Sequence, residues 1–180
     1  MTRSKKIEQA KSSMMPMMWI LIFLGYEWLV SGINKIASGE FVTGLHGEMM
    51  EAIKEGAPYA VYSDFLKSVC LAHCEILAVL IEAGEIFAGA TFLFIGIVGL
   101  VKGNLSSWLV KIGIASSIVS AILSINIFFY VGGAYFFGQA DPFDEGIPID
   151  LLLFLMELAA IGYFFSLNRL KVTDNRTALN

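Results

Sequence analysis

The chain has 180 residues, of which 57% are hydrophobic and 16% charged, and its formal net charge is −4. Soluble domains usually carry about a quarter charged residues, so this chain has too few polar side chains to cover a soluble fold. The composition also excludes a disordered chain, and two cysteines are too few for a disulfide-stapled mini-protein. We therefore expect an integral membrane protein whose surroundings are the lipid bilayer.

Four stretches are long and apolar enough to cross a bilayer, which takes about 20 mostly apolar residues. Helices satisfy their backbone hydrogen bonds internally, whereas an open strand edge in lipid does not. The sequence therefore predicts an all-α fold, a four-helix transmembrane bundle. The first stretch follows a basic start but is too long for the core of a signal peptide, so we expect it to be retained. The membrane domain covers 14–168, with helices at about 14–36, 64–101, 108–130 and 147–166.

Lysine and arginine are distributed unevenly along the chain. The tails 1–13 and 169–180 are basic, whereas the segment 112–168 contains neither residue type. Cytoplasmic segments carry the positive excess, so we expect both termini in the cytoplasm. The links 37–63 and 131–147 then face outside the cytoplasmic (inner) membrane. No nucleic-acid signature is present, and we expect other membrane protein subunits as partners.

Acidic residues form a stripe along the second predicted helix. At about 100° per residue, Asp64, Lys67, Glu75, Glu82 and Glu85 fall on one face. Ionisable groups in hydrocarbon are costly, so we expect this face to meet other helices or a water-filled cavity. Glu82 and Glu85 are neighbours, and two close carboxylates in a low dielectric do not both ionise cheaply. The pair suits the proton uptake or release that quinone reduction requires, with interhelical hydrogen bonding as the alternative.

The first predicted helix carries a second polar face, with Glu27 deep in the helix and Ser31 and Asn34 beside it. Lys35 lies near the outer end, where it could pair with a carboxylate of the second helix, hold an anion, or extend its ammonium to the interface. Glu157 lies near the middle of the fourth helix. Serines in the third helix favour close helix packing. The predicted catalytic residues are Glu27, Lys35, Glu82 and Glu85.

Cys70, His73 and Cys74 form a short cluster of residue types that commonly bind metals. The spacing is not CxxCH, so covalent haem attachment is unsupported. His46 is the other histidine in the chain, which leaves a metal short of ligands. We expect buried, inert thiols and neither metal nor haem, with metal binding or a redox-active cysteine as alternatives.

Three segments carry short motifs that recur together in one family. Segment 24–36 ends in G-x-x-K, segment 58–66 reads P-Y-A-V-Y-S-D-F-L and leads to G-E at 84–85, and segment 162–168 reads G-Y-F-F-S-L-N. Together they resemble the DoxX/DoxD family of four-helix membrane proteins, which includes the small subunit of archaeal thiosulfate:quinone oxidoreductase. The likeness runs from the first helix to the fourth.

The resemblance implies a quinone cofactor and carries over Lys35 and Glu85, with Tyr62 and Phe65 as quinone-binding residues. This chain lacks the family's early arginine, and Asn168 stands where the family closes with aspartate. The acidic links would also repel a thiosulfate dianion. We therefore expect a membrane subunit linked to quinone redox chemistry, with thiosulfate-to-quinone electron transfer as one form of it. A non-catalytic accessory subunit of a respiratory or oxidase complex and a small-solute channel or carrier are the alternatives.

Overall fold

Helices make up the regular structure of the chain in a computed structural model that describes residues 3–55, 59–131 and 148–177. Among these residues there is no strand, and four helical stretches are long and apolar enough to cross a membrane. The predicted all-α, four-span fold is therefore confirmed. The α-helices are α1 (Arg3–Ser38), α2 (Phe41–Glu55), α3 (Ala60–Phe65), α4 (Cys74–Lys102), α5 (Ser107–Tyr130) and α6 (Ile149–Thr177).

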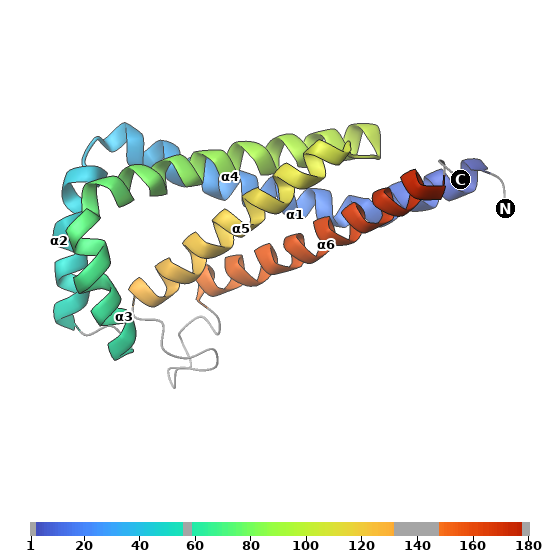
Figure 1. Cartoon of the computed structure of the whole chain (residues 1–180). Coiled ribbons are helices and arrows are strands. Elements are labelled where there is room, and N and C mark those ends of the chain that lie inside the picture. The colour runs from blue at the N-terminus through green and yellow to red at the C-terminus, as the bar shows by residue number, and fades with distance from the viewer. Residues whose placement is uncertain (1–2, 56–58, 132–147, 178–180) are drawn as a thin grey trace, which may run out of the picture.

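The four long helices α1, α4, α5 and α6 run along the length of the molecule, and the short helices α2 and α3 lie across one end of them (Figure 1). The beginning of α1 and the end of α6 lie together at the opposite end (Figure 1). Four crossings bring the two ends of the chain to the same side, because each crossing reverses the direction of the chain. The predicted link 131–147 lies outside the described residues from 132 onward.

Both outer helices extend beyond their predicted spans. The predicted tail 1–13 is helical from Arg3, and Pro16 lies inside α1 rather than at its start. At the other end α6 continues to Thr177, into the predicted tail 169–180. The first tail contains three lysines together with one arginine, one glutamate, one glutamine and one alanine, all good helix formers, so the helix does not need an apolar environment to continue.

The second span is broken near its beginning. Its 43 residues, Ala60–Lys102, would form a helix of about 65 Å, far longer than a hydrocarbon core of about 30 Å. The chain instead leaves α3 through a π-helical turn (Leu66–Cys70) and a 3-10 turn (Leu71–His73) before α4 begins. Figure 1 shows α3 turned away from the direction of α4. The crossing part is therefore α4 alone, and α3 is free to lie beside α2.

Glycines bring α1 and α4 into backbone contact. A Cβ atom on Gly25 would lie 2.6 Å from the amide nitrogen of Leu93 and 2.9 Å from the carbonyl oxygen of Gly89. A Cβ on Gly89 would in turn overlap the backbone of Leu29. Small residues at a membrane helix crossing allow this close approach, and van der Waals packing then holds the two helices together. The crossing fixes the register of α1 on α4 and so determines which residue of α4 the end of α1 meets.

A glycine also allows close packing between α5 and α6. The ring of Phe164 occupies the space beside Gly113, with its Cζ 2.5 Å from where a Cβ would lie. The serines of α5 turn toward the interior and are fully buried, in agreement with their predicted packing role: Ser116, Ser117, Ser120 and Ser124. Large apolar side chains such as Trp19 and Phe94 remain on the outer surface, where acyl chains would cover them.

Candidate functional site

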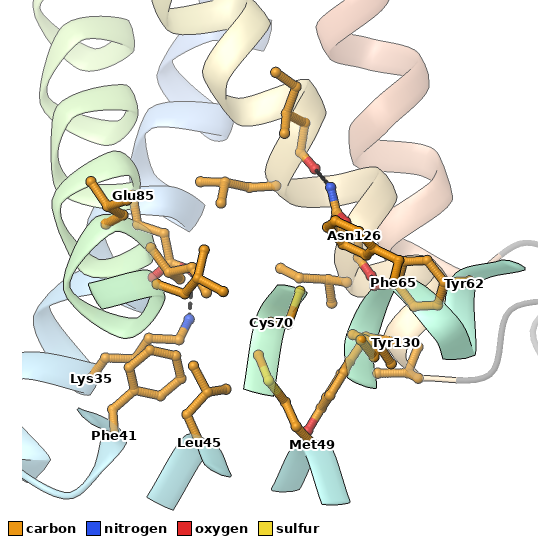
Figure 2. Close-up of a pocket in the computed structure, with 18 residues that line it drawn as sticks. Lys35, Phe41, Leu45, Met49, Tyr62, Phe65, Cys70, Glu85, Asn126 and Tyr130 are labelled. Atoms are coloured by element: carbon orange, nitrogen blue, oxygen red, sulfur yellow. Dashed lines mark hydrogen bonds and ion pairs between the residues drawn. The ribbon is translucent and has the colours of Figure 1, made fainter. Parts of the chain in front are cut away.

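A cavity of about 470 Å³ lies where α2, α3 and the π turn cover the ends of α4 and α5 (Figure 2). Small-molecule sites in proteins usually measure about 300–1,000 Å³, and most of their lining is apolar. Here too the lining is mainly apolar and aromatic, and includes Phe41, Leu45, Met49, Phe65, Leu66 and Ile81. The cavity therefore has the size and the surface to hold a lipophilic ring.

Local sequence explains why α2 covers this cavity. Gly39 adopts a φ of 66°, a conformation that glycine reaches without steric cost, and it ends α1 with a sharp turn. In α2 the apolar residues Leu45 and Met49 are four apart, so they lie on one helical face, and both are buried. Glu48 and Glu51 lie on the exposed face. The helix is thus amphipathic and places its apolar face over the cavity.

A partly buried ion pair lies at one side of the cavity. The Lys35 Nζ donates to Oε1 of Glu85 over 2.5 Å and to Oγ of Ser31 over 2.9 Å. The Glu85 side chain is 0% exposed and that of Lys35 is 23% exposed. The Lys35 ammonium also lies 5.2 Å from the centroid of the Phe41 ring, a cation–π distance. Of the alternatives for Lys35, pairing with a carboxylate of the second span is the one observed.

The second carboxylate oxygen of Glu85 accepts no hydrogen bond from the part of the chain that the structure describes. Oε2 is buried and has no hydrogen-bond partner among the described residues. Most buried polar atoms in proteins are paired, so an exception at the wall of a cavity calls for an explanation. The ion pair thus contains one buried acceptor without a described partner, in a residue that lines the cavity.

The other side of the cavity carries Tyr62, Asn126 and Tyr130 (Figure 2). The Tyr62 hydroxyl donates to the backbone oxygen of Asn126 over 2.9 Å, and the Asn126 side-chain amide donates to the carbonyl of Ile122 over 2.7 Å. The Tyr62 ring lies 5.5 Å from the Phe129 ring, centroid to centroid. These contacts fix α3 against the end of α5 and leave an aromatic wall opposite the ion pair.

Two of the predicted catalytic residues lie away from the cavity. Glu82, one turn before Glu85 on α4, is partly buried and does not line it. Glu27 is exposed on α1. The predicted pairing of Glu82 with Glu85 is therefore replaced by an interhelical pair with α1. The cavity brings together the remaining predicted site residues, Lys35, Tyr62, Phe65 and Glu85.

The predicted inward stripe on the second span is wrong for most of its length, because Asp64, Lys67 and Glu75 are exposed. The angles assumed one continuous α-helix at 100° per residue. The π and 3-10 turns shift the phase between residues 66 and 73, so residues before the break no longer share a face with Glu85. The break accounts for Asp64 and Lys67, whereas Glu75 lies after it, in the first turn of α4, and its exposure does not follow from the break.

The cysteine–histidine cluster lies at the same break. Cys70 and Cys74 are buried free thiols, and Cys70 lines the cavity. His73 is exposed and lies with His46 and Cys74 around a separate hollow of about 440 Å³. Within the described ranges, no three histidine, cysteine or acidic side chains are placed to share a metal ion.

A second buried carboxylate, Glu157, joins three spans. Its Oε1 accepts from Nε1 of Trp28 over 2.7 Å and its Oε2 accepts from Oγ of Ser124 over 2.8 Å. Glu157 is 0% exposed, and the contact ties α6 to α1 and α5. The sequence marked Glu157 and the serines of α5 separately, but nothing in it indicated that Trp28 would complete the group. Both carboxylate oxygens are satisfied here, in contrast to Glu85.

No family model, curated protein or solved structure matches this chain. The DoxX/DoxD resemblance therefore stays a prediction that depends on the short segments themselves. Its implied site residues Lys35, Tyr62, Phe65 and Glu85 do surround one cavity, although they come from three different parts of the chain.

Proposed function

We propose that this protein binds the head group of a membrane quinone in the cavity between α2 and the α4–α5 ends, and that it serves as a quinone-linked redox subunit. The observation that carries the proposal is an apolar, aromatic-lined cavity that ends at the partly buried Lys35–Glu85 pair. A quinone likewise combines a flat apolar ring, which would suit the apolar lining, with polar oxygens on its edge, which would suit the ion pair. The distribution of lysine and arginine favours an orientation with α2 on the outer side of a cytoplasmic membrane.

The position of the cavity supports a ligand that arrives from the lipid phase. Leu80 of α4 and Ile122 of α5 line the cavity and are also 60% and 56% exposed on the outer surface of the spans. An isoprenoid tail leaving the cavity between them would pass directly into acyl chains. The covering helix α2 meanwhile separates the head group from the aqueous side.

The polar groups at the cavity suit chemistry in which protons accompany electrons. Interconversion of quinone and hydroquinone moves protons at the ring oxygens, and a carboxylate within hydrogen-bond reach can accept or release them. Glu85 is the residue placed for this, and Lys35 holds its carboxylate in position through the 2.5 Å contact. Tyr62 and Phe65 supply ring contacts on the opposite wall.

Ligand binding to the purified full chain in detergent tests the proposal. A benzoquinone with a short alkyl tail should raise the melting temperature of the wild type and give saturable heat in calorimetric titration. Met49→Trp fills the cavity from α2, where Met49 is 5% exposed, and should abolish binding. Met50→Trp is the matched control, since the neighbouring residue is 37% exposed on the other face of α2. Absence of quinone binding, or binding that Met49→Trp leaves intact, would refute the proposal.

A further inference from the structure

Both cysteines of the chain border a hollow, and neither has a role in the function proposed above. Cys70 lines the cavity, and in Figure 2 its sulfur lies between the Lys35 side and the Asn126 side. Cys74, four residues later, lines the separate hollow of about 440 Å³. Each side chain is 6% exposed, and both are free thiols. Buried thiols are usually inert because no reagent reaches them, whereas these two adjoin spaces that a ligand can enter.

The two spaces suit different partners. The cavity is mainly apolar and extends to the lipid-facing side chains of Leu80 and Ile122. The separate hollow contains His46, His73 and Glu75, all exposed, and we call it the histidine hollow. Such side chains suit a water-soluble ligand, and an imidazole can accept a thiol proton near neutral pH. One cysteine therefore borders a lipophilic site and the other a polar one.

The backbone between the two cysteines is irregular. Cys70 ends the π turn and Cys74 begins α4, with the 3-10 turn Leu71–His73 between them. Four residues apart on a helix, two Cβ atoms lie about 5–6 Å from each other, whereas a disulfide needs about 3.5–4.5 Å. His73 has a φ of −128° and a ψ of 28°, outside the helical region, so the segment can tighten without breaking a continuous α-helical ladder. The break therefore makes a Cys70–Cys74 disulfide easier to form than it would be in a regular α-helix.

We propose that Cys70 and Cys74 are a redox pair that passes two electrons from a small thiol in the histidine hollow to a quinone in the cavity. This inference rests on the proposed function and deepens it by naming the class of electron donor. When the pair is oxidised, two S–H bonds break and one S–S bond forms, and the two electrons and two protons convert the quinone to hydroquinone. The donor then reduces the disulfide by exchange at Cys74, and two donor thiols leave as the donor disulfide.

Oxidation of the pair is tested by counting thiols on the reduced full chain in detergent under anaerobic conditions. The probe is a benzoquinone with a short alkyl tail and a fully substituted ring, because an open ring position would add to a thiol. One equivalent should consume both free thiols, lower the protein mass by two hydrogen atoms and yield one equivalent of hydroquinone by absorbance. Mass spectrometry should place the disulfide within the single peptide that contains both cysteines.

Variants assign this oxidation to the pair and to the cavity. Cys70→Ala and Cys74→Ala each leave one thiol, which should survive the same treatment. Val69→Ala makes a similar truncation at a 43% exposed position of the π turn and should still lose both thiols. Met49→Trp keeps both cysteines but fills the cavity, so its thiols should survive as well. Should the cysteine variants fail to fold, the wild type, Val69→Ala and Met49→Trp still decide the matter.

The electron donor is tested with dithiothreitol, a small water-soluble dithiol, after the pair has been oxidised and the quinone removed. Dithiothreitol should restore both thiols of the wild type. With excess quinone present it should sustain hydroquinone formation, which Cys70→Ala and Cys74→Ala should each abolish. A disulfide that dithiothreitol fails to reduce overturns the relay, as does turnover that persists in Cys74→Ala.

The outcomes separate this inference from the proposed function. Loss of both thiols with matching hydroquinone, followed by recovery in dithiothreitol, supports the relay. Thiol loss that Met49→Trp does not prevent overturns it, since the quinone then reacts outside the cavity. Saturable quinone binding that leaves both thiols reduced also overturns the relay but leaves the quinone site in place. Absence of quinone binding overturns the proposed function itself, and the relay with it.

Discussion

Replacing Lys35 with methionine should destabilise the protein by about 3–5 kcal/mol. The substitution keeps the length and the apolar stem of the side chain but leaves Glu85 buried without its cation, and loss of one partner of a buried pair typically costs this much. Contact between the two charged atoms is short, at 2.5 Å, and Glu85 is 0% exposed. At an effective dielectric constant of about 20 their attraction is about 7 kcal/mol before desolvation is subtracted, so the expected loss is well within the available interaction.

A double-mutant cycle isolates the pair from the other contacts of each residue. The free energy of unfolding would be measured in mixed micelles for the wild type, Lys35→Met, Glu85→Gln and the double variant. We expect the double variant to recover a large part of the loss seen in Lys35→Met, because it contains no unpaired buried charge. Lys67→Met is the matched control, since Lys67 is exposed on the π turn and its charge should contribute little.

Two results would refute this reasoning. One is a loss of less than about 1 kcal/mol in Lys35→Met, which would mean that Glu85 finds another partner or reaches water. The other is strict additivity of the two single substitutions, which would mean that the residues do not interact in the folded protein.

Three further substitutions test separate parts of the structure. Trp28→Phe removes the donor to Glu157 and should lower stability in the same unfolding assay by about 1–3 kcal/mol, because a buried carboxylate oxygen loses its partner. Gly89→Ala places a methyl group against the backbone of Leu29 and should cost about 1–3 kcal/mol by forcing α1 and α4 apart. Tyr62→Phe keeps the ring but loses the hydrogen bond to α5, so we expect about 1 kcal/mol less stability and weaker binding of the short-tailed benzoquinone in titration calorimetry.

The first two of these substitutions have controls that should be close to neutral. Trp19→Phe makes the same change as Trp28→Phe at a half-exposed position of α1. Gly162→Ala adds a methyl group to α6 where nothing lies within 4 Å. If the controls destabilise the protein as much as Trp28→Phe and Gly89→Ala do, the losses come from general effects on the helices and the specific contacts are not their cause.

The spans could be predicted because hydrophobicity over about 20 residues is a property of the sequence itself. The break at residues 66–73 carries no such signal, since the segment L-K-S-V-C-L-A-H contains neither proline nor glycine. Helix length alone indicated that the second span must bend or project. The place of the bend depends on α2, whose buried Leu45 and Met49 pack beside Leu66, Cys70 and Cys74.

The sequence predicted only part of the candidate site, because helical periodicity does not show how two helices pack. Periodicity placed Glu82 and Glu85 together, but it could not say which of them α1 would cover. The close crossing at Gly25 decides this, because it brings Lys35, further along α1, to Glu85. Glu27 is two residues from Gly25, about 200° around the helix, and so lies on the side away from the crossing.

The segment that covers the cavity is a single connection between two spans. Both α2 and the α3–π-turn wall lie between the end of α1 and the start of α4, while the helices below them are held by their own glycine and phenylalanine contacts. Substitutions confined to this segment would therefore change the cover of the cavity and leave Lys35 and Glu85, on the helices below, in place.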